Sequence, residues 1–216
     1  MREEIISAIE KNKIIVIVRG VEKENLIPLA EAMYEGGIRL LEITFSANGK
    51  ITDKQTAENI KMLSEHFDGK MYIGAGTVLK ESQVELVKKA RGGFIISPDT
   101  NEAVVTKTRE LGLVSMPGAL TPTEIQAAHR SGADFVKLFP ISNLGSNYVR
   151  AVKAPLSHIK LLAVGGIYDE NIAEYLSAGV SGFGIGSNIT NKKLIANGEF
   201  DKITALARKY VTALGE

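Results

Sequence analysis

The chain has 216 residues, of which 44% are hydrophobic, 26 are basic and 25 are acidic, giving a formal net charge of +1. This composition predicts one globular domain, residues 1–216, with a sizeable core. Because basic and acidic residues are nearly equal in number, we expect no strongly basic surface that would bind nucleic acid. The absence of cysteine excludes disulfides, thiolate catalysis and cysteine-bound metal. The charged N-terminus is unlike a signal peptide and no apolar run approaches ~18 residues, so we expect a cytoplasmic protein without a membrane partner.

Eight buried strand segments recur along the chain, and a helical pattern follows each. The first strand is 14–20, and the others end near residues 42, 77, 97, 117, 139, 164 and 186. Helical periodicity covers residues 1–13, 23–35, 52–66, 81–90, 102–111, 123–131, 147–154, 170–178 and 200–214. Eight such units in about 200 residues predict a (β/α)8 TIM barrel with an extra N-terminal helix. A doubly wound sheet is the alternative, but its glycine fingerprint is missing after the first strand.

One lysine, Lys137, lies inside the hydrophobic run 135–139. Side chains alternate along a strand, so Phe135, Lys137 and Phe139 share one face. Burial between two rings disfavours the ammonium ion, which we expect to lower the pKa of the lysine and leave neutral amine for Schiff-base formation. The alternative is a lysine whose stem lies on apolar surface while its head reaches water.

Two further charged residues fall at strand ends, where TIM barrels carry their active sites. Arg19 continues the face of Ile15 and Ile17, and Glu42 follows Leu40 on the next strand. Either residue alone fits a solvent-facing loop charge. Together with Lys137 they place a nucleophile, a carboxylate and a guanidinium at equivalent positions of three strands, which favours catalysis.

Glycine-rich sequences end the last two predicted strands, at Gly165-Gly166 and Gly186-Ser187. Glycine lets the backbone approach a ligand, and amides at the following helix starts favour an anion. Phosphate sites in this fold often form after strands 7 and 8, so we favour a phosphate site over tight barrel corners. Residues 74–77 are read equally well as a pocket wall offering the Thr77 hydroxyl or as a tight turn.

The three histidines, at positions 66, 129 and 158, fall in helices or loops rather than at strand ends. Surface or helix-packing roles suit them best. We expect neither a metal site nor a cofactor.

Over nearly its whole length the sequence resembles the 2-dehydro-3-deoxyphosphogluconate aldolases, also called 4-hydroxy-2-oxoglutarate aldolases. The motifs that carry the resemblance are IVIVRG, GGIRLLEITF, YIGAGTV, FIISPDTN, MPGALTPTE, KLFP, VGGI and GIGS. The resemblance implies a Schiff-base class I aldolase, a carbon–carbon lyase on a (β/α)8 barrel, commonly homotrimeric and without a metal. Its substrate would be a phosphorylated 2-keto acid, cleaved to pyruvate and glyceraldehyde 3-phosphate, and 4-hydroxy-2-oxoglutarate would give pyruvate and glyoxylate.

The resemblance also implies roles for individual residues. Lys137 would form the imine, Glu42 would be the acid/base, and Arg19 would bind the pyruvate-derived carboxylate. The pocket would be lined by Thr77, Pro98 and Phe139, with Val164 facing the middle of the substrate. The phosphate would be bound by Gly165, Gly166, Gly186 and Ser187.

Two positions depart from the family pattern. Some members have arginine four residues after the catalytic glutamate, where this chain has Ser46, so a carboxylate contact from that position is absent. Many gluconate-type members have threonine where this chain has Val164, which resembles the galactonate-type aldolases. A 2-dehydro-3-deoxy-6-phosphogalactonate aldolase is therefore an alternative, as are a non-covalent phosphate-binding barrel isomerase with Glu42 as base and a barrel that only binds phosphorylated ligands.

Overall fold

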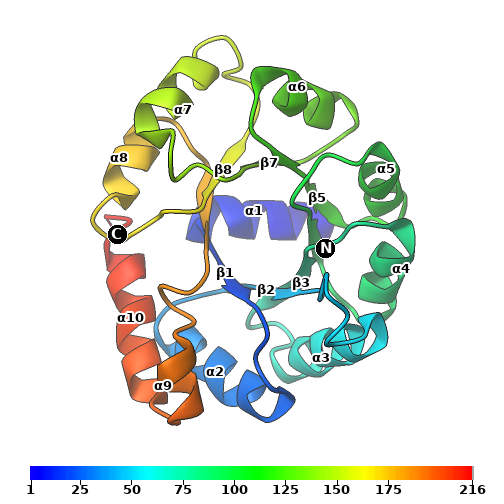
Figure 1. Ribbon diagram of the computed structural model, residues 1–216, viewed down its shortest axis with the longest axis vertical. Helices are drawn as coiled ribbons and strands as arrows, with labels where there is room; N and C mark the ends of the chain where they lie inside the picture. Colours follow the sequence, from blue (N-terminus) through cyan, green and yellow to red (C-terminus); the bar gives the residue numbers. More distant parts are fainter. Residues whose placement is uncertain (216) are drawn as a thin grey trace.

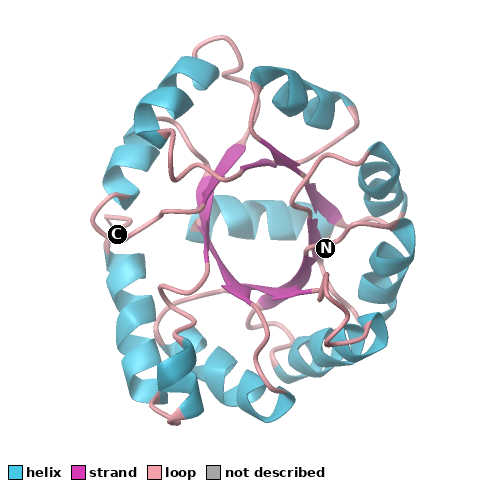
Figure 2. Cartoon of the chain, viewed as in Figure 1, coloured by secondary structure: helices cyan, strands magenta, loops and turns pink. Residues whose placement is uncertain are grey.

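Parallel strands form a ring in the computed structural model, which describes residues 1–215 (Figure 2). The strands are β1 (Ile14–Val18), β2 (Leu40–Thr44), β3 (Tyr72–Gly76), β4 (Phe94–Ile96), β5 (Val114–Met116), β6 (Gly118–Ala119), β7 (Val136–Leu138), β8 (Leu161–Val164) and β9 (Gly182–Ile185). The helices are α1 (Arg2–Asn12), α2 (Lys23–Glu35), α3 (Asp53–His66), α4 (Glu81–Lys89), α5 (Glu102–Glu110), α6 (Pro122–Arg130), α7 (Gly145–Lys153), α8 (Ile172–Ser177), α9 (Lys192–Ala196) and α10 (Phe200–Thr212). No helix within these residues is both long and apolar enough to cross a membrane.

The ring closes through a strand that is interrupted at Pro117. The strand order is β5-β4-β3-β2-β1-β9-β8-β7-β6, and β5 and β6, at its two ends, are separated only by this proline. Proline has no N–H and breaks the ladder, but its carbonyl accepts from Lys137 N at 2.8 Å. The nine segments are therefore eight barrel strands, and the predicted (β/α)8 barrel is confirmed.

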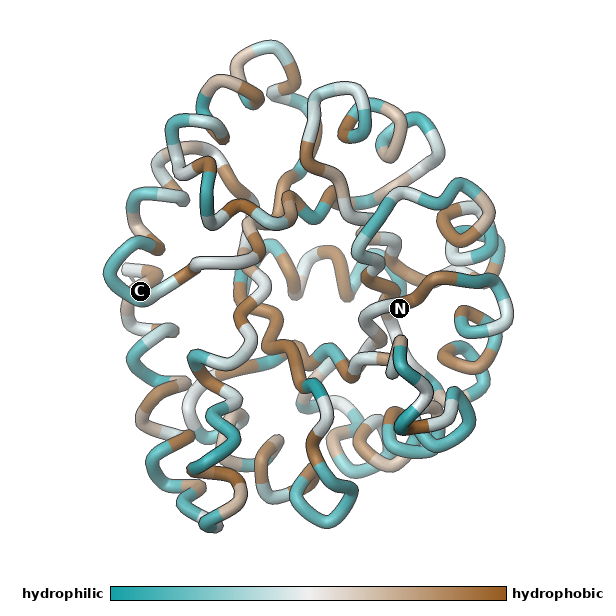
Figure 3. The backbone as a smooth tube through the Cα atoms, in the orientation of Figure 1, coloured by the Kyte–Doolittle hydropathy of each residue, from teal (hydrophilic) through white to brown (hydrophobic). Residues whose placement is uncertain are grey.

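Two layers of apolar side chains stabilise the barrel. Most strand residues of one parity pack outward against the ring of helices, whereas those of the other parity form a smaller cluster inside the ring. In Figure 3 the strands are mainly brown and the outer helices carry much of the teal. The alternation is clear on β7, where Phe135 and the lysine face inward while Val136 and Leu138 join the outer layer.

Helix α1 closes one end of the barrel and lies across the ring at the back of the view in Figure 1. Its Ile5 and Ile9 belong to the inner cluster. Glu4 accepts a hydrogen bond of 2.6 Å from Tyr72, the first residue of β3, and Arg2 pairs with Asp134 just before β7. These contacts all lie at the amino ends of the strands, so the carboxyl ends remain open.

The helix ends mostly follow the capping signals in the sequence. Asn101 caps α5, and Thr121 with Glu124 forms a capping box at α6, with Pro122 in the first turn. The prediction of a helix start at 170 is wrong, because residues 168–171 form a turn in which Tyr168 N donates to the Asn171 side chain. Helix α9 was not predicted, since five residues show too little periodicity.

Candidate active site

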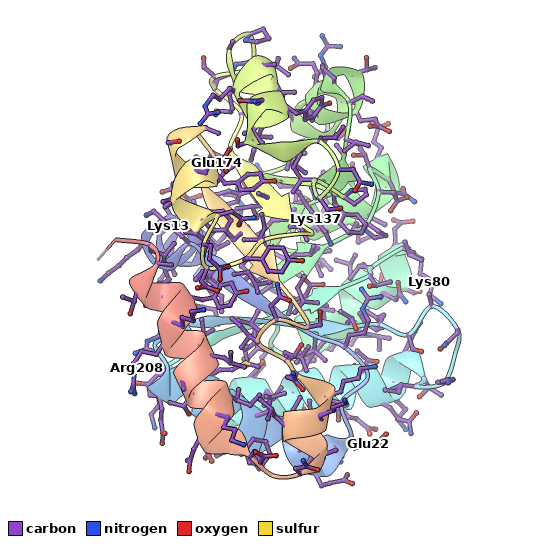
Figure 4. The ribbon with its side chains drawn as sticks, turned by 60° about the vertical axis from the view of Figure 1, so that its left-hand side comes forward. Lys13, Glu22, Lys80, Lys137, Glu174 and Arg208 are labelled. Carbon is purple, nitrogen blue, oxygen red and sulfur yellow. The ribbon has the colours of Figure 1, made fainter. Side chains whose placement is uncertain are left out.

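Lys137 occupies the middle of β7 and points into the barrel. Its side chain is only 6% exposed, and Nζ lies 4.9 Å from the centre of the Phe139 ring. Figure 4 shows Lys137 in the body of the molecule, in contrast to Lys80 and Arg208 at its edges. The structure thus gives the buried position that the sequence suggested, and not a lysine whose head extends into solvent.

Glu42 lies on β2 and is 1% exposed. Burial raises the pKa of this carboxyl, while the charges of Lys137 and Arg19 oppose the shift. Its Oε1 is buried and has no hydrogen-bond partner among residues 1–215. Buried polar atoms are nearly always satisfied, so an unsatisfied carboxylate oxygen beside two cationic side chains is a strong indication of a functional site.

Glycines of β3 provide the space that these side chains need. A Cβ on Gly76 would overlap Glu42 Oε1, and a Cβ on Gly74 would overlap the Phe94 ring. Both glycines lie within the strand rather than in a turn. Of the two interpretations left open by the sequence, the tight turn is wrong for these two glycines, and the pocket wall stays a prediction.

Arg19 and Thr77 meet across the end of the intervening strand. Arg19 follows β1 and Thr77 follows β3, and β2 with Glu42 lies between these two strands. Arg19 Nη2 donates to Thr77 Oγ1 at 3.3 Å. Thr77 has φ of +56°, a conformation that costs free energy for a β-branched residue and that clusters at functional sites. The guanidinium is exposed at the rim of the barrel and is available to an anionic group of a ligand.

Two predicted lining residues, Pro98 and Val164, lie at the carboxyl ends of β4 and β8. Pro98 follows β4 and packs closely on Gly118. A Cβ added to Gly118 would overlap the carbonyl group of Pro98. Val164 is 6% exposed and directs its methyl groups toward the strand partner Gly184. Its side chain therefore faces the barrel interior, like that of Leu162 two residues earlier, and its place beside the substrate stays a prediction.

The glycine-rich loops after β8 and β9 expose unpaired backbone donors. Gly165 and Gly166 have φ of +95° and +70°, respectively. No hydrogen bond within residues 1–215 uses the N–H groups of Gly166, Ile167, Ser187 or Asn188. The expectation of helix-start amides is wrong, because α8 begins at Ile172 and α9 at Lys192. The unpaired amides belong to the loops themselves, and two successive residues of the loop after β8 are in the left-handed region.

Sequence reasoning missed the side chains that support these loops. Asn171 donates to Gly166 O at 2.9 Å, and Asn188 donates to Ile167 O at 2.8 Å. Tyr210 of α10 lies behind Asn188. Nothing in the sequence marks them, because asparagine is common in loops and Tyr210 has the periodicity of an ordinary core residue.

The histidines lie away from this site. His66 contacts Glu31 at 3.0 Å, and the rings of His129 and His158 stack edge to face with centres 5.2 Å apart. In the part of the chain that the structure describes, no three potential ligand side chains group as a metal site would require.

A cleft of about 510 Å³ opens at the other end of the barrel, beside α1 and the starts of β3 and β4. Neither Lys137 nor Glu42 lines it. We place the candidate active site at the carboxyl ends of the strands, where the buried ionisable groups lie. The volume of a cleft does not by itself indicate catalytic residues.

A model of the KDPG and KHG aldolase family matches residues 5–206 of the chain. The chain belongs to this family. It is accordingly an aldolase, and hence a lyase.

Relatives with two different substrate names resemble this aldolase. A probable 2-dehydro-3-deoxy-6-phosphogalactonate aldolase of Rhizobium meliloti is 33% identical and covers 94% of this chain and 93% of the relative. A 2-dehydro-3-deoxy-phosphogluconate aldolase of Treponema pallidum is 32% identical, with 98% of each chain covered. The KDPG aldolase of Legionella pneumophila, solved with pyruvate as a covalent carbinolamine intermediate, has a TM-score of 0.84 and 27% identity over 94% of this chain and 96% of that one.

Proposed function

We propose that this aldolase cleaves 2-dehydro-3-deoxy-6-phosphogluconate to pyruvate and glyceraldehyde 3-phosphate through a Schiff base on Lys137. The observation that carries the proposal is the pairing of a buried lysine with a buried, unpartnered carboxylate at the mouth of a barrel. The carbinolamine of the Legionella pneumophila relative supports covalent chemistry in this family. The smaller 4-hydroxy-2-oxoglutarate would follow the same path to pyruvate and glyoxylate.

The reaction follows from the two buried groups. The neutral amine of Lys137 attacks the 2-keto carbon, and loss of water leaves a protonated imine. Glu42, directly or through one water, takes the proton of the C4 hydroxyl; the C3–C4 bond breaks, the aldehyde leaves, and the bonding electrons pass into the enamine. The carboxylic acid then returns the proton to C3, and hydrolysis of the imine releases pyruvate. A pKa raised by burial suits a carboxylate that must accept and return a proton.

Arg19 and the glycine-rich loops hold the two ends of the substrate in this proposal. The Arg19 guanidinium binds the carboxylate next to the reacting carbon, oriented by its bond to Thr77. The unpaired amides of Gly166 and Ser187 bind the phosphate. Pro98 and Phe139 line the space between the two ends.

A second candidate is the galactonate epimer, 2-dehydro-3-deoxy-6-phosphogalactonate. Val164 permits it, because a valine facing the barrel interior offers no hydrogen bond that would select one orientation of the C4 hydroxyl. The name of the Rhizobium meliloti relative points the same way. We propose that both epimers are cleaved.

Borohydride trapping tests the central step. Sodium borohydride added with pyruvate should inactivate the enzyme and attach one reduced pyruvyl group to Lys137, identified by peptide mass analysis. Lys137→Arg should fold but neither trap nor turn over, since guanidinium cannot be deprotonated in proteins. Lys160→Arg is the matched control, because this lysine is half exposed outside the site, and it should behave as wild type. Labelling at another lysine, or turnover without labelling, would contradict the proposal that Lys137 forms the Schiff base.

Three further expectations from the sequence are part of this proposal. The composition and the N-terminal sequence imply a single catalytic domain, residues 1–216, in the cytoplasm, and the family resemblance implies a homotrimer.

A further inference from the structure

The loop after β8 is held by side chains that bind its carbonyl oxygens from outside. Asn188, in the loop after β9, donates to Ile167 O at 2.8 Å, and the Tyr210 hydroxyl lies 3.5 Å from the same oxygen. Asn171 donates to Gly166 O at 2.9 Å and accepts from Tyr168 N at 2.9 Å. Two consecutive peptide groups of the loop are thereby fixed.

Fixing a carbonyl also fixes the amide on the other side of the same peptide. The peptide group is planar and trans, so the N–H of Ile167 points opposite to the carbonyl of Gly166. The bond from Asn171 to that carbonyl therefore orients an amide that has no partner within residues 1–215. Glycines at positive φ have little conformational preference of their own, and this loop needs such external ties to hold its amides in place.

Asn188 differs from Asn171 because it joins two loops. Its backbone follows Ser187 at the end of β9, while its side chain binds the loop after β8. This bond therefore ties the two sets of unpaired amides to each other. Tyr210 is 3% exposed and its hydroxyl donates to the same Ile167 oxygen at 3.5 Å, so α10 supports the bridge from behind. Lys209, next to Tyr210, pairs with Asp169 at 2.7 Å and holds the same loop.

We infer that Asn188 is a positioning residue for anion recognition: through Ile167 it sets the gap between the loops at 165–167 and 186–188, with Tyr210 as its support. The inference rests on the proposed function, in which these loops bind the phosphate of the substrate. Asn188 acts through the backbone and makes no contact with the reacting carbons, so its loss should affect a phosphorylated substrate and spare an unphosphorylated one.

The test compares substrates with and without phosphate. Asn188→Ala should raise KM for 2-dehydro-3-deoxy-6-phosphogluconate by about tenfold, the effect of one lost hydrogen bond, with kcat and the KM for 4-hydroxy-2-oxoglutarate nearly unchanged. Tyr210→Phe should raise the same KM by less, because Asn188 keeps its bond to Ile167. Asn12→Ala is the matched control: its side-chain amide also donates to a backbone carbonyl, Ala8 O at 2.8 Å, but at the closed end of the barrel.

Direct binding of inorganic phosphate separates this inference from the proposed function. Calorimetry should show a phosphate dissociation constant about tenfold higher for Asn188→Ala than for wild type or Asn12→Ala. If wild type cleaves neither substrate, the proposed function fails, and the phosphate measurement still decides the inference. Wild type that does not bind phosphate, an unchanged dissociation constant, or equal losses on both substrates would each overturn it. Should Asn188→Ala fail to fold, the same comparison with Tyr210→Phe, whose ring still packs, replaces it.

Discussion

At the scale of single residues, Glu42 is buried, ionisable and unsatisfied at Oε1. We predict that Glu42→Gln still traps pyruvate with borohydride but cleaves substrate slower by ~10²-fold or more, because the amide keeps the shape and loses the base. Single-turnover kinetics and trapping yields measure the two steps separately. Equal losses in both would assign Glu42 a structural role.

The raised pKa of Glu42 also links its protonation to stability. Burial shifts the pKa above 4.5 in the folded chain, so over the pH range between 4.5 and that raised value the unfolded chain binds fewer protons than the folded one. The free energy of unfolding contributed by this group therefore falls as pH rises through that window. Urea unfolding at about pH 5 and about pH 7 should show that wild type loses stability relative to Glu42→Gln. A pH-independent difference in stability would indicate that the positive charges of Lys137 and Arg19 offset the effect of burial on the Glu42 carboxyl.

Val164 is the residue at which substrate choice can be tested. Its side chain faces the barrel interior beside Gly184, and threonine has nearly the same shape with one hydroxyl added. Val164→Thr should shift kcat/KM toward the gluconate epimer by about 1–2 kcal/mol, the scale of one hydrogen bond. Wild type already selective by more than about a thousandfold would show that other residues set the stereochemistry.

At the scale of elements, we expect α1 to contribute to the stability of the barrel and not to substrate binding. Ile9 is fully buried in the inner cluster at the closed end of the barrel. Ile9→Ala should lower the free energy of unfolding by about 2–4 kcal/mol through the cavity it leaves, with KM unchanged. Denaturant unfolding measures the loss, and Ser7→Ala, on the exposed face of the same helix, is the control. A large rise in KM would mean that α1 shapes the active site through the barrel interior.

At the scale of the whole molecule, the homotrimer is the property to measure. One chain has a mass of 23.3 kDa, and closed cyclic assemblies are the rule for soluble homo-oligomers. Because the family resemblance implies a homotrimer, light scattering coupled to size-exclusion chromatography should give about three times this mass. A mass of one chain at micromolar concentration would contradict the trimer without affecting the assignment to the family.

The sequence by itself determined the eight repeating units, the extra N-terminal helix, the shared inward faces that carry Lys137 and Glu42, and the place of Arg19 after the first strand. These follow from local rules, since a strand alternates its faces and an apolar run is buried wherever it lies. The tertiary structure alone decided that Gly76 leaves room for Glu42, that Arg19 bonds Thr77 over β2, and that Asn188 joins two loops. Each of these contacts joins residues of different β-α units, and no local pattern marks a partner that only barrel closure brings near.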